Sequence, residues 1–108
     1  MPIAIKERHE KRAMDIKPLI DFPREGETIS SAEYTFRINA PEAAQRVEIA
    51  VDQGEWLTCR QSTGYWWCDW SGYDNGPHEI VSRLITADGK TTLSQPTEFC
   101  VQFEKQPE

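Results

Sequence analysis

Long hydrophobic runs are missing from this sequence of 108 residues. No apolar stretch approaches the roughly 20 residues that a membrane-spanning helix needs. Residues 1–14 also carry charges where the apolar part of a secretory signal would lie. We therefore expect no membrane partner and, for a chain that starts at Met1, a cytoplasmic location.

Cysteine is scarce, with Cys59, Cys68 and Cys100 as the three instances. An odd number without a closely spaced pair argues against a disulfide framework and a zinc site. Cys59 and Cys68 flank a predicted turn and could face each other across a hairpin, although a reducing cytosol would keep them as thiols. We interpret the cysteines as small buried apolar residues, with a redox role as the alternative.

Histidine is also scarce, and the sequence contains no motif that marks a catalytic or phosphate-binding site. The two histidines are His9 and His78, and no spacing places a nucleophile with an orienting carboxylate beside His78. Asp69 and Asp74 could approach each other, but nothing marks them as a glycosidase pair. The segment 74–76 lacks the further ligands of a calcium loop, so we interpret it as a turn. We predict no catalytic residues, no metal and no cofactor.

Basic residues are few outside the first part of the chain. Residues 1–17 carry five Lys or Arg and three acids, whereas the remainder carries seven bases and fifteen acids, within a net charge of −6. An acidic body repels phosphate backbones, which argues against nucleic acid as a partner. The basic arm is interpreted as a solvated tail, with contact to an acidic surface as the alternative.

Alternating apolar residues are abundant, and they predict strands. Tyr34, Phe36 and Ile38 alternate with polar residues, and so do Val47, Ile49 and Val51. Turn signals at Asp52-Gln53-Gly54 and Asp88-Gly89 predict two hairpins, with Gly54 expected to take a positive φ. A short apolar segment, 18–22, is expected to form an edge strand.

The pattern amounts to about seven short strands and no substantial helix, which is typical of an all-β, immunoglobulin-like antiparallel β-sandwich. We expect a flexible N-terminal arm over residues 1–17, the sandwich domain over 18–104 and a C-terminal tail over 105–108.

The most distinctive segment is the aromatic strand 64–70, GYWWCDW. In an extended chain, Tyr65, Trp67 and Asp69 share one face, and Trp66, Cys68 and Trp70 share the other. A lone buried carboxylate is costly, so the Asp69 face is expected to lie outside. This leaves Tyr65 and Trp67 partly exposed as candidate binding residues, unless a neighbouring segment covers them.

Two further aromatic residues need an assignment. Trp56 follows a turn and alternates with Leu57, and we interpret it as a core residue. Tyr73 lies in a glycine-containing loop and is a candidate for the rim of a binding surface.

Two stretches carry a family resemblance. The sequence VEIAVDQGEW, from Val47 to Trp56, resembles the VEVSxDGGxW hairpin of many bacterial immunoglobulin-like and fibronectin-III-like modules. The segments 76–80 and 87–89 resemble the G-x-H-x-I strand and A-x-D-x-G turn of the same modules, and similar hairpins occur in the C-terminal domain of sulfite-oxidase-type enzymes. The resemblance covers residues 33–103 and implies an early-set accessory module without catalytic residues. The density of Trp and the three Cys depart from the pattern.

Glycogen- and starch-binding modules of the early-set class share the hairpin layout and often carry exposed Trp. Our leading prediction is a non-enzymatic interaction domain that binds a protein partner through a sheet face or edge. The alternative is a carbohydrate-binding module for α-glucans that uses Tyr65, Trp67 and Tyr73.

Overall fold

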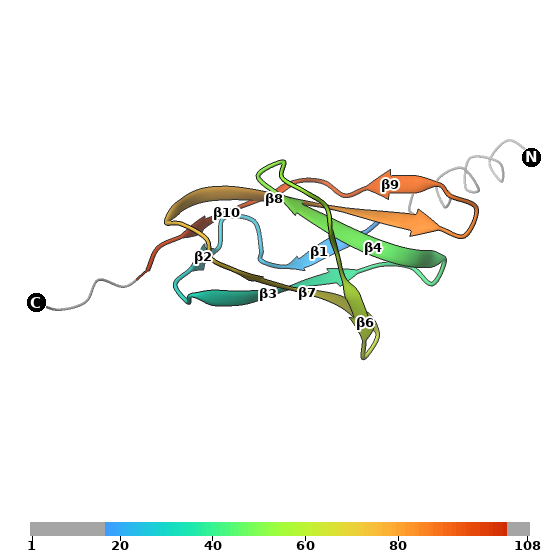
Figure 1. The fold of residues 1–108 in the computed structure, drawn as a ribbon, viewed down its shortest axis with the longest axis horizontal. Helices are drawn as coiled ribbons and strands as arrows, with labels where there is room; N and C mark the ends of the chain where they lie inside the picture. The colour runs from blue at the N-terminus through green and yellow to red at the C-terminus, as the bar shows by residue number, and fades with distance from the viewer. Residues whose placement is uncertain (1–16, 104–108) are drawn as a thin grey trace, which may run out of the picture.

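The computed structural model describes residues 17–103, which fold into two β-sheets packed face to face (Figure 1). No helix occurs in this part of the chain, and so none that could cross a membrane. The all-β sandwich expected from the alternation is confirmed. The predicted arm and tail lie almost wholly outside the described residues.

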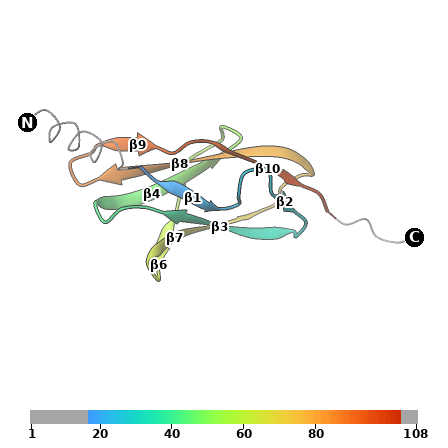
Figure 2. The ribbon, with the colours of Figure 1, turned by 180° about the vertical axis from the view of Figure 1, so that it is seen from behind.

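The first sheet has the strand order β1-β3-β7-β6. Its strands are β1 (Leu19–Phe22), β3 (Glu33–Asn39), β7 (Tyr65–Ser71) and β6 (Arg60–Ser62). The predicted edge strand at 18–22 is confirmed, because β1 pairs with β3 at the edge of this sheet, as the view from behind shows (Figure 2).

The second sheet has the order β2-β10-β8-β4-β5, and β9 also pairs with β8. Its strands are β2 (Thr28–Ile29), β10 (Thr97–Val101), β8 (Gly76–Thr86), β4 (Ala44–Val51), β5 (Leu57–Thr58) and β9 (Thr91–Leu93). The sequence predicted about seven strands, and the described residues contain ten, because several connections add strands of two or three residues.

The core lies between the sheets and is built from the inward residues of both. The alternation in β3 and β4 predicted these positions correctly, since period two directs every second side chain to one face. The apolar strand residues that are essentially inaccessible are Phe36, Ile38, Val47, Ile49, Ile80, Leu84 and Val101.

The chain changes sheets between β5 and β6 (Figure 1). Cys59 is the residue between them, and its backbone N–H donates to the Val47 carbonyl at 2.8 Å. The segment therefore closes one side of the sandwich, because β5 pairs with β4 in one sheet and β6 pairs with β7 in the other.

The hairpin after β4 is confirmed, but the prediction for its glycine is wrong. Positive φ occurs at Asp52 (53°) and Gln53 (61°), not at Gly54. The Gly54 N–H donates to the Val51 carbonyl at 2.9 Å. A Cβ on Gly54 would lie 3.1 Å from that same oxygen, so a larger residue would crowd this carbonyl, and glycine suits the position through close approach and not through its φ.

Candidate interaction surface

The outer face of the β1-β3-β7-β6 sheet carries a row of aromatic and arginine side chains. Arg37 on β3 places its guanidinium 4.6 Å from the Phe22 ring centre and 4.3 Å from that of Tyr65. Tyr65 meets Trp67 edge to face, with centroids 6.1 Å apart. The guanidinium of Arg24 also lies over the Phe22 ring, 5.3 Å from its centre. We call these five residues the outer aromatic row.

The row forms because the register brings its members side by side. Phe22 on β1 pairs with Arg37 on β3, and Arg37 pairs with Trp67 on β7. Asp21 fixes Arg37 from the side through an ion pair of 3.2 Å. The indole N–H of Trp67 donates to the Ser62 carbonyl at 2.8 Å. The aromatic rings are thus ordered before any partner arrives, while Tyr65 and Trp67 stay half-exposed.

The inward side of β7 agrees with the predicted parity. Trp66 and Cys68 are buried, and Trp70 packs on Phe36 and Phe99 at centroid distances of 5.2 and 5.6 Å. Alternation along one strand therefore separates core aromatics from surface aromatics, because successive side chains point to opposite faces.

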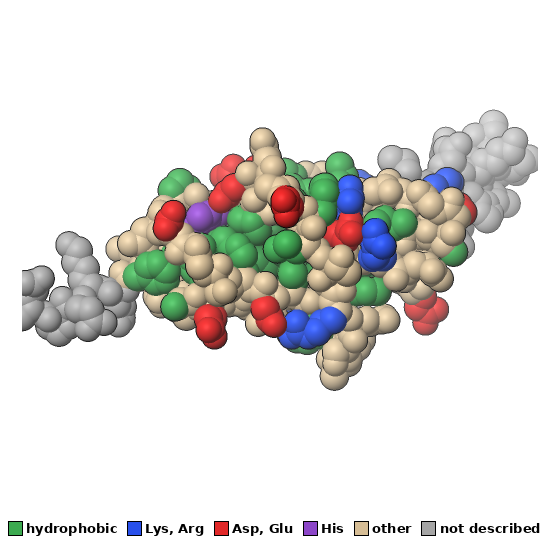
Figure 3. Space-filling model, in the orientation of Figure 1, with side chains coloured by type: hydrophobic (Ala, Val, Ile, Leu, Met, Phe, Trp, Pro, Cys, Tyr) green, Lys and Arg blue, Asp and Glu red, His purple; other side chains and the backbone are tan. Residues whose placement is uncertain are grey.

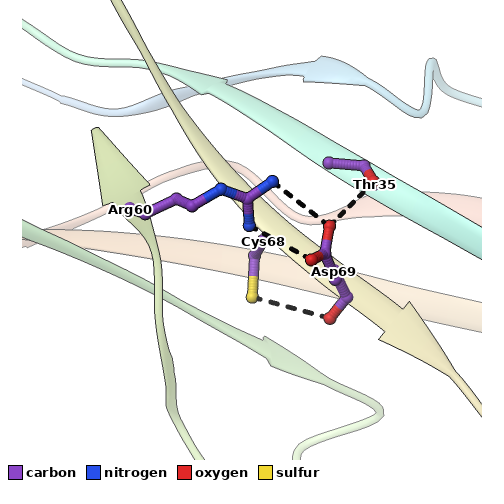
Figure 4. A network of polar contacts seen from close by, with 4 residues as sticks. All are labelled: Thr35, Arg60, Cys68 and Asp69. Atoms are coloured by element: carbon purple, nitrogen blue, oxygen red, sulfur yellow. Dashed lines mark hydrogen bonds and ion pairs between the residues drawn. The ribbon is translucent and has the colours of Figure 1, made fainter. Parts of the chain in front are cut away.

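Asp69 continues the outer face of β7 beyond Trp67. Its carboxylate accepts hydrogen bonds from the Thr35 hydroxyl at 2.9 Å and from the Arg60 guanidinium at 3.2 and 3.4 Å (Figure 4). These bonds hold the pKa of Asp69 below its usual value, and the bond from Thr35 has the largest effect. The carboxylate is exposed, as the cost of burying a charge led us to expect.

Tyr73 is placed apart from Tyr65 and Trp67. Its ring stacks on Trp70 at 3.8 Å, and its hydroxyl donates to the Ser31 carbonyl at 2.6 Å. Trp70 faces the core, so Tyr73 covers the end of the core, on the other side of the sheet from the outer aromatic row. A ligand on the outer face would not reach it.

The prediction that Trp56 belongs to the core is wrong. A regular two-residue turn at Asp52-Gln53 would place Trp56 opposite Ile49, which faces inward. The observed register pairs Ile49 with Leu57, one residue further on. A slip of one residue exchanges the two faces of a strand, so Trp56 moves to the outer face of the second sheet.

Sequence reasoning missed the ionic cluster that covers Trp56. Arg83 places its guanidinium 4.0 Å from the Trp56 ring centre and binds Glu48 at 2.7 Å. Arg46 binds the second oxygen of Glu48 at 3.2 Å. Glu48 is buried although it lies on the outer face, where both arginines bind its carboxylate. Only the β4–β8 register, which pairs Glu48 with Arg83, could have revealed this cluster.

His78 has both ring nitrogens occupied. Nδ1 lies 2.7 Å from the Asp52 carboxylate, and Nε2 lies 2.8 Å from the Asp74 carbonyl. Burial lowers the pKa of His78, but these two contacts outweigh it and leave the pKa above its usual value. Such a histidine joins loops at one end of the sandwich and has no free nitrogen with which to activate a nucleophile.

Cys59 and Cys68 meet in the core, as their flanking positions suggested. Both are buried free thiols. The neighbouring Cys68 thiol, together with burial, raises the pKa of Cys59. The same contact lowers the pKa of Cys68, so Cys68 is the more acidic thiol of the buried pair.

Within residues 17–103 no group of three or more His, Cys, Asp or Glu side chains is arranged to hold a metal ion. Asp74 and Asn75 lie in the connection before β8, which begins at Gly76, and the Asn75 side chain accepts a hydrogen bond from the Phe103 N–H at 2.8 Å.

No family model matches the sequence, and no curated protein matches it well enough to indicate a relative. Solved structures do match. The fibronectin(III)-like modules of Clostridium thermocellum CbhA give a TM-score of 0.69 at 15% identity, over 82% of this chain and 99% of the module. The chain has an immunoglobulin-like, fibronectin-III-like fold.

Two further solved structures resemble this module. A modular endo-β-1,4-mannanase from Cellulomonas fimi matches 79% of the module at 25% identity with a TM-score of 0.62. BhCBM56 matches 67% of the module and 83% of its own chain at 17% identity with a TM-score of 0.51. The module spans only 18% of the mannanase, and 20% of an engineered protein that it also matches.

Proposed function

We propose that the module is a non-catalytic accessory domain that binds a protein partner through the outer face of the β1-β3-β7-β6 sheet. The observation that carries this proposal is the outer aromatic row, where Phe22, Tyr65 and Trp67 lie among arginines. Tyr, Trp and Arg are the side chains that most often dominate binding energy in protein interfaces. Their mutual contacts also reduce the rotamer entropy that binding would otherwise cost.

The structural neighbours support an accessory role. They include fibronectin(III)-like modules and a carbohydrate-binding module, and the mannanase is described as modular. A cytoplasmic location and the absence of nucleic-acid and membrane partners stay sequence-based predictions.

Carbohydrate binding is the second candidate, because Tyr65 and Trp67 are half-exposed and the neighbours include a carbohydrate-binding module. The geometry of the two rings favours a protein instead. Their planes meet at 75°, so they do not form one flat platform for a sugar chain. Arg37 also covers one face of Tyr65.

Comparative capture from a native lysate of the source cells tests the protein-binding proposal. The wild-type module and the variants Trp67→Ala and Trp56→Ala are immobilised in equal amounts. We expect a protein that is enriched by the wild type and by Trp56→Ala, and lost with Trp67→Ala. Equal capture by all three would contradict binding through this face.

A fluorescence titration tests the carbohydrate candidate. Soluble α-glucan and β-mannan are added to the wild type and to Trp67→Ala. Quenching that appears only in the wild type would establish sugar binding at this face, and unchanged emission at millimolar sugar would remove the candidate.

A further inference from the structure

The edge of β7 is open beyond β6. The β6–β7 pairing ends at Arg60 and Trp67. The hairpin turn has two residues with φ of 51° and 84°, which makes it type I′, so Ser62 and Tyr65 exchange both backbone bonds. Backbone groups of alternate residues point the same way, so those of Asp69 and Ser71 point to the β6 side. No strand within residues 17–103 pairs with them there.

The same side of the sandwich exposes part of the core. Figure 3 shows hydrophobic side chains gathered between the two layers. His78 lies at this part of the core, with its ring 5.2 Å from that of Trp70. Trp70, the residue between the two open backbone positions, is half-buried. Leu57 pairs with the core residue Ile49 on the same side and is 40% exposed. The Asp69 carbonyl accepts a long contact of 3.9 Å from the Cys68 thiol, but neither Asp69 nor Ser71 has a strand partner on this side (Figure 4). Backbone without a strand partner beside exposed core is the pattern of a sheet that can accept another strand.

The charge at this edge is acidic. Asp69 and Glu33 lie in adjacent rows on the outer face, since Glu33 pairs with Ser71 and Thr35 pairs with Asp69. Both line a hollow of about 340 Å³ together with Tyr34, Thr35, Trp70 and Ser71. Within residues 17–103, Arg60 forms an ion pair with Asp69 and no cation forms one with Glu33. Both partners of the Arg60–Asp69 contact are exposed, so this ion pair is weak.

We infer that the β7 edge at Asp69–Ser71 accepts an extended segment of a protein partner, in which apolar residues alternate with Lys or Arg. The backbone of the segment pairs with Asp69 and Ser71. Its apolar side chains cover the exposed core beside Trp70, and its basic side chains face Asp69 and Glu33. The inference goes beyond the proposed function, because it uses the sheet edge and not the outer aromatic row.

A second copy of the module fits this edge less well. Pairing of β7 with its own copy would bring the acidic side chains Asp69 and Glu33 of both copies together without added cations. Like charges at close range disfavour such pairing. Charge therefore selects a basic segment over a second copy.

The test uses a capped peptide of seven alternating Lys and Val residues, followed by amide resonances and hydrogen exchange of the full chain. We expect slowed exchange at the Asp69 and Ser71 N–H groups when the peptide is present. A peptide with Glu in place of Lys should bind at least about tenfold more weakly.

Two variants separate backbone pairing from side-chain contact. Ser71→Ala keeps the N–H and should bind as the wild type does, whereas Ser71→Pro removes the N–H and should lose at least about tenfold in affinity. If Ser71→Pro does not fold, hydrogen exchange of the wild type with the peptide decides whether the backbone of Ser71 pairs with it.

Equal binding of the Lys and Glu peptides, or protection elsewhere than at Asp69 and Ser71, would overturn the inference. So would protection of these amides in the protein alone with concentration-dependent dimerisation, which would identify a second copy as the occupant. If the peptide fails but capture still depends on Trp67, the edge inference falls and the proposed function stands.

Discussion

At the residue scale, Trp56 and Trp66 show how differently the same side chain is used. Trp66 is 7% exposed and lies in the core, whereas Trp56 lies on the outer face against Arg83. The ring of Trp66 cannot be removed without leaving a cavity, while solvent can fill the space that Trp56 leaves.

We therefore predict that Trp66→Ala lowers the free energy of unfolding by about 3–5 kcal/mol. Trp56→Ala should cost less, about 1–2 kcal/mol, from lost burial and lost contact with Arg83. Urea denaturation of both variants measures the difference. A greater loss for Trp56→Ala would show that its assignment to the outer face is wrong.

His78 makes stability depend on pH. Its pKa is raised in the folded state, so its charged form is favoured there by Asp52 and the Asp74 carbonyl. The stabilisation is complete below the unfolded pKa of about 6.5 and is lost as pH rises through the folded value.

We predict that the wild type loses stability relative to His78→Gln as the pH rises from about 6 to 8, the range in which histidine titrates. The difference in denaturation midpoint between the two proteins, followed across this range, isolates His78 from the carboxylates. A difference that is independent of pH would contradict the charged assignment.

At the scale of elements, the β6–β7 hairpin combines a strained turn with a pair of thiols. Thr63 has a φ of 51°, a left-handed conformation that β-branched residues rarely adopt. Asn tolerates this conformation, and Asn-Gly is the preferred pair for a type I′ turn. We predict that Thr63→Asn raises the free energy of unfolding by about 1 kcal/mol.

Thermal denaturation checks this prediction, with Thr63→Val as the matched control because it keeps the β-branch. Stabilisation by Val as large as that by Asn would remove the conformational explanation.

The two thiols beside this hairpin lead to a second prediction. Cys59 and Cys68 flank the pair Arg60–Trp67, so the register places them at facing positions. We predict that oxidised glutathione links them in preference to Cys100, since the two thiols already meet. Peptide mapping by mass spectrometry should find the Cys59–Cys68 link, with a raised denaturation midpoint. A link to Cys100 would contradict the placement of these thiols.

The elements also show what the sequence can and cannot predict. The strand around Phe36 and Ile38 follows from alternation alone, because period two fixes its faces. Trp56 could not be placed this way, since one extra residue after the turn reverses the parity and no local signal marks it. The outer aromatic row could be predicted only in part, because Arg37 and Phe22 join Tyr65 through pairing of strands distant in the sequence.

At the scale of the whole molecule, two sheets bury one core and leave two different outer faces. One face carries the outer aromatic row, and the other carries Trp56 with the Glu48 ion pairs. Arg46 and Arg83 both bind Glu48, so the charge of this carboxylate is already paired within the module. The outer aromatic row keeps half-exposed rings, which a partner could bury.

Oxidative footprinting of the four tryptophans, with and without the captured partner, tests this account most directly. We predict that Trp66 stays unreactive throughout, while Trp67 reacts in the free module and is protected in the complex. Trp56, on the opposite face, should react equally in both states. Unchanged reactivity of Trp67 on binding, or protection of Trp56 in its place, would contradict the account.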